Sequence, residues 1–170
     1  SVVTYPAGLF TTVKWHDGSS ISAADFMMAM IMTFDRAYPD SPIYDESYVP
    51  NFESFQGTFK GFKITSTDPL TVEYYSDFYY SDAELDVTTL WPSSPNGLQG
   101  ENGWDIFAIS NAAEAAGELA YTPDKAEANT VEQTSWVGGP SLDILSKYLD
   151  EAIAGSTIPY EPTMGAYITA

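Results

Sequence analysis

The segment at 22–38, SAADFMMAMIMTFDRAY, constrains the fold more than any other part of the chain. Ser22 is a typical N-cap residue and Asp25 stands three positions later, which is the pattern of a capping box. The apolar residues that would share one helical face are Phe26, Met27, Met30, Ile31 and Phe34. Since Pro39 and Pro42 prevent continuation, the sequence predicts one well-bounded helix.

Two β-rich runs flank the sequence TSTDPL at 65–70, where the Asp-Pro pair favours a turn. Phe62 and Ile64 fall on one side of the first run. Val72 and Tyr74 fall on one side of the second. The pattern predicts a hairpin or two neighbouring antiparallel strands.

The chain becomes helical after residue 103. The Ala-rich segment 104–120 predicts a helix with one buried stripe, formed by Trp104, Phe107, Ala108 and Ala115. Thr122 followed by Pro123 is typical of the start of another, shorter helix.

A further helix is predicted over 141–155. Its apolar residues recur at intervals of three and four, at Leu142, Leu145, Leu149 and Ala152 or Ile153. Gly155 is expected to end it as the residue after the C-cap. The predicted fold class is therefore α/β in the mixed α+β sense, with a strand-rich part at 1–95 and a mainly helical part at 96–170.

Composition excludes several partner classes. Acidic residues outnumber basic residues by 24 to 6, for a net charge of −18. Nucleic-acid binding and attachment to anionic membranes both need Lys and Arg, so we expect neither. No apolar run reaches the roughly 18 residues of a membrane span. The chain has no cysteine, so disulfides and thiolate metal sites are excluded.

The only histidine, His16, stands beside Asp17, as part of a Ser-His-Asp triad could. Adjacent residues in a turn generally point apart, however, and no GxSxG sequence is present to hold a nucleophile. A zinc site would have to consist mostly of carboxylates. We therefore expect no catalytic residue, no metal site and no cofactor.

Two alternatives stay open because acidic and aromatic residues are abundant. Asp82, Glu84 and Asp86 would share one face of a strand, where a solvated face is the simpler interpretation and a calcium-dependent scaffold the alternative. A carboxylate pair for glycoside hydrolysis could be chosen from many acids, so the sequence singles out none. A fragment of a secreted carbohydrate-binding or glycoside-hydrolase protein is therefore the second interpretation.

The segment 43–58 shows no sustained period and contains a proline, so we expect a long loop or short helical turns there. This loop and the strands after it are rich in aromatic residues. Pairs such as Tyr74-Tyr75 and Tyr79-Tyr80 would face opposite ways on a strand, with one ring in the core and one outside. Packing in the core and against a neighbouring lobe explains them most simply, with stacking on a ligand as the alternative.

Two stretches of the chain resemble the bacterial extracellular solute-binding proteins of family 5, which are the oligopeptide, dipeptide and nickel-type receptors of ABC importers. The first stretch, VKWHDGSSISAADF, fits the family pattern at Val13, Lys14, Trp15, Asp17, Gly18, Ile21, Ser22, Ala23, Asp25 and Phe26. The second, a strand that begins Asp-Pro-x-Thr-Val, is matched by Asp68, Pro69, Thr71 and Val72. Together they cover about residues 10–77.

The resemblance implies that residues 1–170 are one lobe of a larger protein with a periplasmic-binding-protein type II fold. In such receptors the solute binds between lobes, and closure presents the complex to a membrane permease. The implied partners are a peptide or other small solute, an ABC permease and the remaining lobes of the same chain. The implied location is periplasmic or extracellular, with membrane attachment through the permease or a lipid anchor outside this segment.

The resemblance also assigns roles to residues. Structural roles at a strand-turn-helix corner are expected for Trp15, Asp17, Gly18, Ser22 and Asp25. A strand would end near Trp15, Asp17-Gly18 would form the turn, and Ser22 with Asp25 would cap the helix. Tyr44 and Tyr48 occupy the loop where related peptide receptors offer a tyrosine to the cleft, so they are the expected ligand-binding residues.

Overall fold

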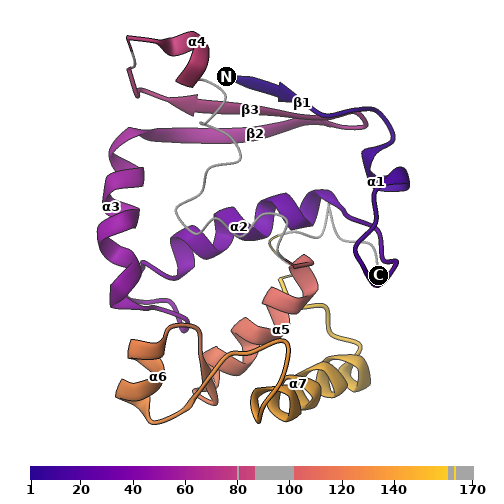
Figure 1. The fold of residues 1–170 in the computed structure, drawn as a ribbon, viewed down its shortest axis with the longest axis vertical. Helices are drawn as coiled ribbons and strands as arrows, with labels where there is room; N and C mark the ends of the chain where they lie inside the picture. The colour runs from indigo at the N-terminus through magenta and orange to yellow at the C-terminus, as the bar shows by residue number, and fades with distance from the viewer. Residues whose placement is uncertain (80, 87–101, 161–162, 164–170) are drawn as a thin grey trace.

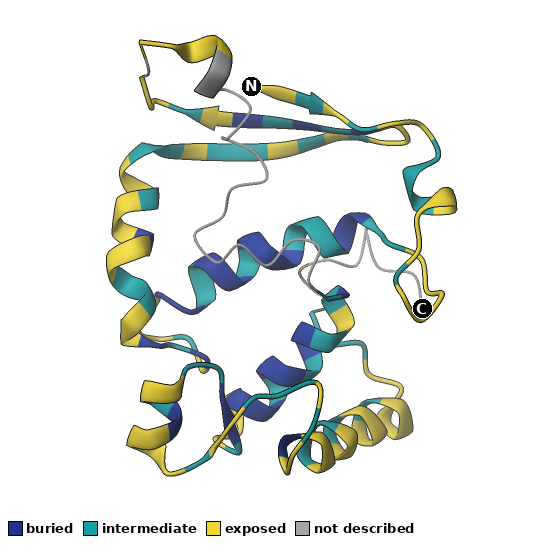
Figure 2. Ribbon diagram, in the orientation of Figure 1, coloured by how far each residue is buried: buried dark blue, intermediate teal, exposed yellow. Residues whose placement is uncertain are grey.

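The computed structural model describes residues 1–79, 81–86, 102–160 and 163, and it has the expected mixed α+β class. Figure 1 shows a small sheet, a central helix α2 (Ala23–Asp35) beside it, and a group of helices on the other side of α2. Buried residues concentrate along α2 and its neighbours (Figure 2). The central helix therefore belongs to both halves of the molecule.

The start of α2 confirms the predicted capping box. The Ser22 side chain accepts a hydrogen bond from Ala24 N at 3.2 Å, and the Asp25 carboxylate accepts one from Ser22 N at 2.6 Å. These bonds satisfy backbone N–H groups that have no partner inside the helix. Burial raises the pKa of Asp25, although its hydrogen bonds act in the opposite direction.

Two opposite faces of α2 are buried, where the sequence predicted one. Met30 packs with the predicted residues Phe26 and Phe34 against the sheet. On the other side, a second core contains Ala24, Met28, Met32, Phe107 and Ala108. A helix that is apolar on both sides is typical of a central layer between two others.

The predicted hairpin is confirmed. Strands β2 (Phe59–Thr67) and β3 (Leu70–Ser76) pair antiparallel, and β1 (Val2–Thr4) joins the free edge of β3, so the strand order is β1-β3-β2. Val72 and Tyr74 are buried whereas Tyr75 is exposed, as the alternation predicted. Tyr79 is 88% exposed, and Tyr80 lies outside the described residues.

The corner before α2 differs from the prediction in one respect. No strand ends at Trp15. A short helix α1 (Leu9–Thr12) comes first, and the only pairing described there is a single bridge between Lys14 and Ser20. The turn itself is as predicted: Gly18 has φ +90°, and the Asp17 carboxylate accepts hydrogen bonds from the backbone and hydroxyl of Ser19.

For 43–58 the sequence predicted a long loop or short helical turns, and most of this segment is helical. A 3₁₀ turn η1 (Glu46–Tyr48) leads into the ten-residue helix α3 (Val49–Thr58). Pro50 stands in the first turn of α3, where its missing N–H is not needed, so it does not break the helix. The rings of Phe52 and Phe55 pack on Phe34 of α2, which fixes α3 against the central helix.

The second half is helical, as predicted. It contains α5 (Trp104–Ala115), β4 (Leu119–Ala120), α6 (Pro123–Asn129), β5 (Glu132–Gln133) and α7 (Ser141–Gly155), with β4 and β5 paired parallel. Thr122 caps α6 as expected. Three details were wrong. Ala115 is exposed, Gly155 is the last residue of α7 with Ser156 in the left-handed conformation after it, and Ala83–Asp86 form a short helix α4 and not a strand.

Asp25 also joins the two halves. One of its carboxylate oxygens serves the capping box, and the other accepts a hydrogen bond from Trp104 N at 2.8 Å, at the start of α5. The N-cap of α5 is Gly103, which has no side chain to offer. A single carboxylate therefore caps two helices that are 79 residues apart in sequence at this contact.

We expect Ser22→Ala to lower the free energy of unfolding by about 1 kcal/mol, because it removes the N-cap oxygen. Urea denaturation measures the effect. The control is Ser54→Ala, at an exposed position of α3, which should change stability by less than about 0.5 kcal/mol. Equal effects of the two substitutions would contradict the role of the cap.

Candidate functional site

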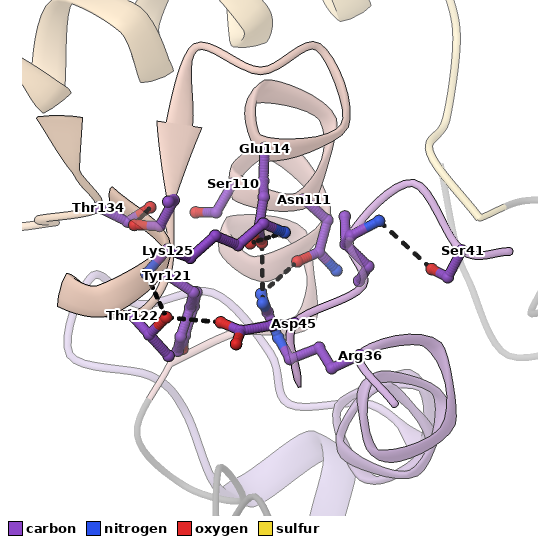
Figure 3. Close-up of polar contacts among 12 residues, drawn as sticks. Arg36, Ser41, Asp45, Ser110, Asn111, Glu114, Tyr121, Thr122, Lys125 and Thr134 are labelled. Carbon is purple, nitrogen blue, oxygen red and sulfur yellow. Dashed lines mark hydrogen bonds and ion pairs between the residues drawn. The ribbon is translucent and has the colours of Figure 1, made fainter. Parts of the chain in front are cut away.

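The only arginine of the chain, Arg36, lies fully buried at the C-terminal end of α2. Its guanidinium forms an ion pair with Glu114 of α5 at 2.8 Å and donates a hydrogen bond to Asn111 at 3.1 Å (Figure 3). The guanidinium carbon lies 4.1 Å from the ring centroid of Tyr121. A buried charge requires such partners, because its desolvation is otherwise very unfavourable.

Lys125 of α6 completes this cluster. Its ammonium group contacts the other oxygen of Glu114 at 2.8 Å, so one buried carboxylate is shared by two cations. The Lys125 side chain is 17% exposed, whereas those of Arg36 and Glu114 are almost fully buried. Lys125 is thus the member of the cluster that reaches solvent.

Asp45 holds the turn between α2 and α3 against α6. Its carboxylate accepts hydrogen bonds from the backbone and hydroxyl of Ser47, at 3.0 and 2.7 Å, and from the hydroxyl of Thr122 at 2.5 Å. Burial by itself would raise the pKa of Asp45. The bonds from Thr122 and Ser47, with the charge of Lys125, outweigh it and hold that pKa below the usual 3.8.

The two tyrosines proposed as ligand-binding residues have different environments. Tyr44 lines a hollow of about 530 Å³ between the turn and α6, together with Asp45, Glu46, Ser47, Asp124, Lys125, Ala128 and Asn129. Tyr48 does not line it. Its ring lies over Arg36, 5.5 Å from the guanidinium carbon, and burial raises its pKa. The structure therefore brings Tyr44 and Lys125 together at the hollow and places Tyr48 next to the buried Arg36.

Sequence reasoning missed Arg36, Glu114 and Lys125. One signal was available, since a single arginine in a strongly acidic chain stands at the end of its most apolar helix. Its partner could not be found that way, because Glu114 is one of 24 acidic residues.

The hollow offers few features of a catalytic centre. A general acid at neutral pH needs a raised pKa, and that of Asp45 is lowered. His16 is exposed in the turn before α2, away from the hollow. Among the residues that the structure describes, no three His, Asp or Glu side chains are grouped to hold a metal ion, and no helix is both long and apolar enough to cross a membrane.

Comparisons with known proteins add no assignment: no protein-family model matches this chain, and no curated protein matches it.

We expect Arg36→Met to lower the free energy of unfolding by about 1–3 kcal/mol, because the buried oxygens of Glu114 and Asn111 lose a donor while Lys125 still compensates the charge of Glu114. Lys60→Met is the matched control, since it breaks the ion pair with Asp77, in which both side chains are about half exposed. Such a surface pair contributes about 0–1 kcal/mol to the free energy of unfolding. Urea denaturation of both variants gives the comparison, and similar losses would contradict the role of the buried pair.

We expect Asp45→Asn to destabilise the protein in a pH-dependent way. The folded-state pKa of Asp45 is lowered, so its ionised form stabilises the fold above the unfolded value, and this contribution is lost as pH falls through the folded pKa. The loss of stability relative to the parent protein should thus be largest above about pH 5 and should shrink below pH 3.8.

Thermal denaturation across this pH range measures that difference. Asp40→Asn, at an exposed position in the same connection, is the control for the change in net charge. A destabilisation by Asp45→Asn that stays constant with pH would show that its charge is not involved.

Proposed function

We propose that this chain is one lobe of an extracytoplasmic solute-binding protein that delivers a peptide or another small solute to an ABC permease. The remaining lobes of the same protein and the permease are its partners in this proposal. The chain itself carries out no covalent chemistry. The proposal rests on the two stretches that resemble the family, and on what the fold does with them.

The observation that carries the proposal is the way these stretches meet. The helix α2, which follows the Trp-x-Asp-Gly turn, packs through Phe26 and Met30 on the hairpin that contains Leu70 and Val72. Residues 40 to 46 positions apart in the sequence thus share one hydrophobic core. Such packing is expected if the two stretches that match the family pattern belong to one structural unit.

The hollow beside Tyr44 supports solute binding at this lobe. Its volume of about 530 Å³ lies within the range of about 300–1,000 Å³ that is usual for small-molecule sites. Tyr44 lines the hollow, and Lys125 adds an ammonium group near solvent. The ion pair with Glu114 holds Lys125 in place before a solute arrives, and the backbone N–H of Tyr44 donates a hydrogen bond to Ser41 O within the turn.

The test is a binding screen of the 170-residue chain against dipeptides, tripeptides and nickel chelates, by thermal shift and then by titration calorimetry. A solute at 100 times its Kd should add about 2.7 kcal/mol to the free energy of unfolding. We expect Tyr44→Ala to weaken the binding of that solute at least about tenfold.

Tyr79→Ala, which removes a tyrosine that is 88% exposed and not part of the hollow, is the matched control and should leave binding unchanged. The hollow is excluded as a solute site if no solute in the screen binds, or if both variants lose affinity equally. Hydrolysis of a peptide during the titration would contradict the proposal.

A further inference from the structure

The apolar stripe of α7 is largely uncovered. Leu142, Leu149 and Ile153 are 40%, 48% and 68% exposed, although they belong to the stripe that predicted this helix. The half-buried residues of α7 are Ile144, Leu145, Tyr148 and Ala152, on the adjoining face towards α5. Figure 2 shows α7 exposed along most of its length. The helix thus uses one part of its apolar surface within the fold and leaves the other part to solvent.

Leu142 and Leu149 of this stripe, together with Leu145 and Ser146, form one wall of a groove. Ile106 and Ile109 of α5 and Trp136 of the connection before α7 line the other side, and the groove holds about 330 Å³. Val137, next to Trp136, is 96% exposed. Large apolar side chains gathered on a surface in this way are typical of an interaction site.

The charges around the groove define the kind of partner. Asp105 lines it directly, and Asp143 and Asp150, seven residues apart, follow the solvent side of the α7 stripe. The only base on α7 is Lys147, which is paired with Glu118 at 2.6 Å. A second copy of the chain would bring a further charge of −18, and an anionic membrane would also be repelled.

We propose that the groove between α5 and α7 is a docking site for a basic amphipathic helix of another protein. Apolar residues at i, i+3 and i+7 of that helix would contact Leu142, Leu149 and Trp136. Lys or Arg on its flank would pair with Asp143 and Asp150. Such helix-in-groove recognition combines apolar anchors with charge complementarity. The groove is separate from the hollow beside Tyr44, so this inference does not depend on the proposed function.

The test uses the 170-residue chain and synthetic peptides of about 15 residues, a length similar to that of α7. One peptide has leucines on one helical face and lysines on the flank. A second has the same composition with the leucines dispersed, and a third carries glutamates in place of the lysines. Fluorescence anisotropy gives the affinities, and amide chemical shifts in NMR spectra locate the contact.

We expect the first peptide to bind one to one and to shift the amides of α5, α7 and residues 135–137. The dispersed peptide should bind at least about tenfold more weakly, and the acidic peptide should not bind. The double variant Leu142→Ser/Leu149→Ser should weaken the binding of the first peptide at least about tenfold. Val2→Ser/Val13→Ser, which removes two exposed valines elsewhere, is the matched control and should leave the affinity unchanged.

The variant Asp143→Asn/Asp150→Asn tests the charge component. It should weaken the binding of the first peptide about fivefold at low salt, with a smaller effect at high salt. The proposal is overturned if no peptide binds, or if binding survives the leucine substitutions, since net charge alone would then explain it. Self-association, or binding to phosphatidylserine vesicles, that the leucine substitutions abolish would also overturn it.

Discussion

The buried ion pair between Arg36 and Glu114 is the interaction on which the arrangement of the two halves depends. It joins the end of α2 to α5 inside the protein, where neither charge can be satisfied by water. Each member needs the other, and both need the correct placement of Asn111, Tyr121 and Lys125. Removal of one partner would leave the other charge buried and short of partners, so the two charges are compatible only with an arrangement in which the end of α2 meets α5.

The apolar layers make the same connection on a larger scale. The central helix contributes Met30 to the core under the sheet and Met28 and Met32 to the core against α5. A change in one core therefore shifts the helix that forms the other. Because α2 begins at the Asp25 cap and ends at Arg36, polar contacts fix both of its ends while side-chain packing fixes its faces.

Local signals in the sequence were sufficient for the starts of α2, α5, α6 and α7, the Gly18 turn and the hairpin, since each depends on neighbouring residues. They were not sufficient where distant parts of the chain decide the outcome. Pro50 looked like a helix breaker until its place in the first turn of α3 was known. The stripe on α7 predicted a helix correctly, but not that much of the stripe would face solvent. Tyr44 was proposed from the resemblance alone, whereas Lys125, which lines the same hollow, comes from α6, about 80 residues later.

The shared use of the Asp25 carboxylate has a consequence for cooperativity. The same side chain stabilises the first turns of α2 and α5, so fraying of one helix start disturbs the acceptor that holds the other. The strand-rich and helical parts are therefore coupled through this carboxylate. A chain divided between them would leave one piece with an uncapped helix and the other with a half-buried carboxylate that has lost a donor.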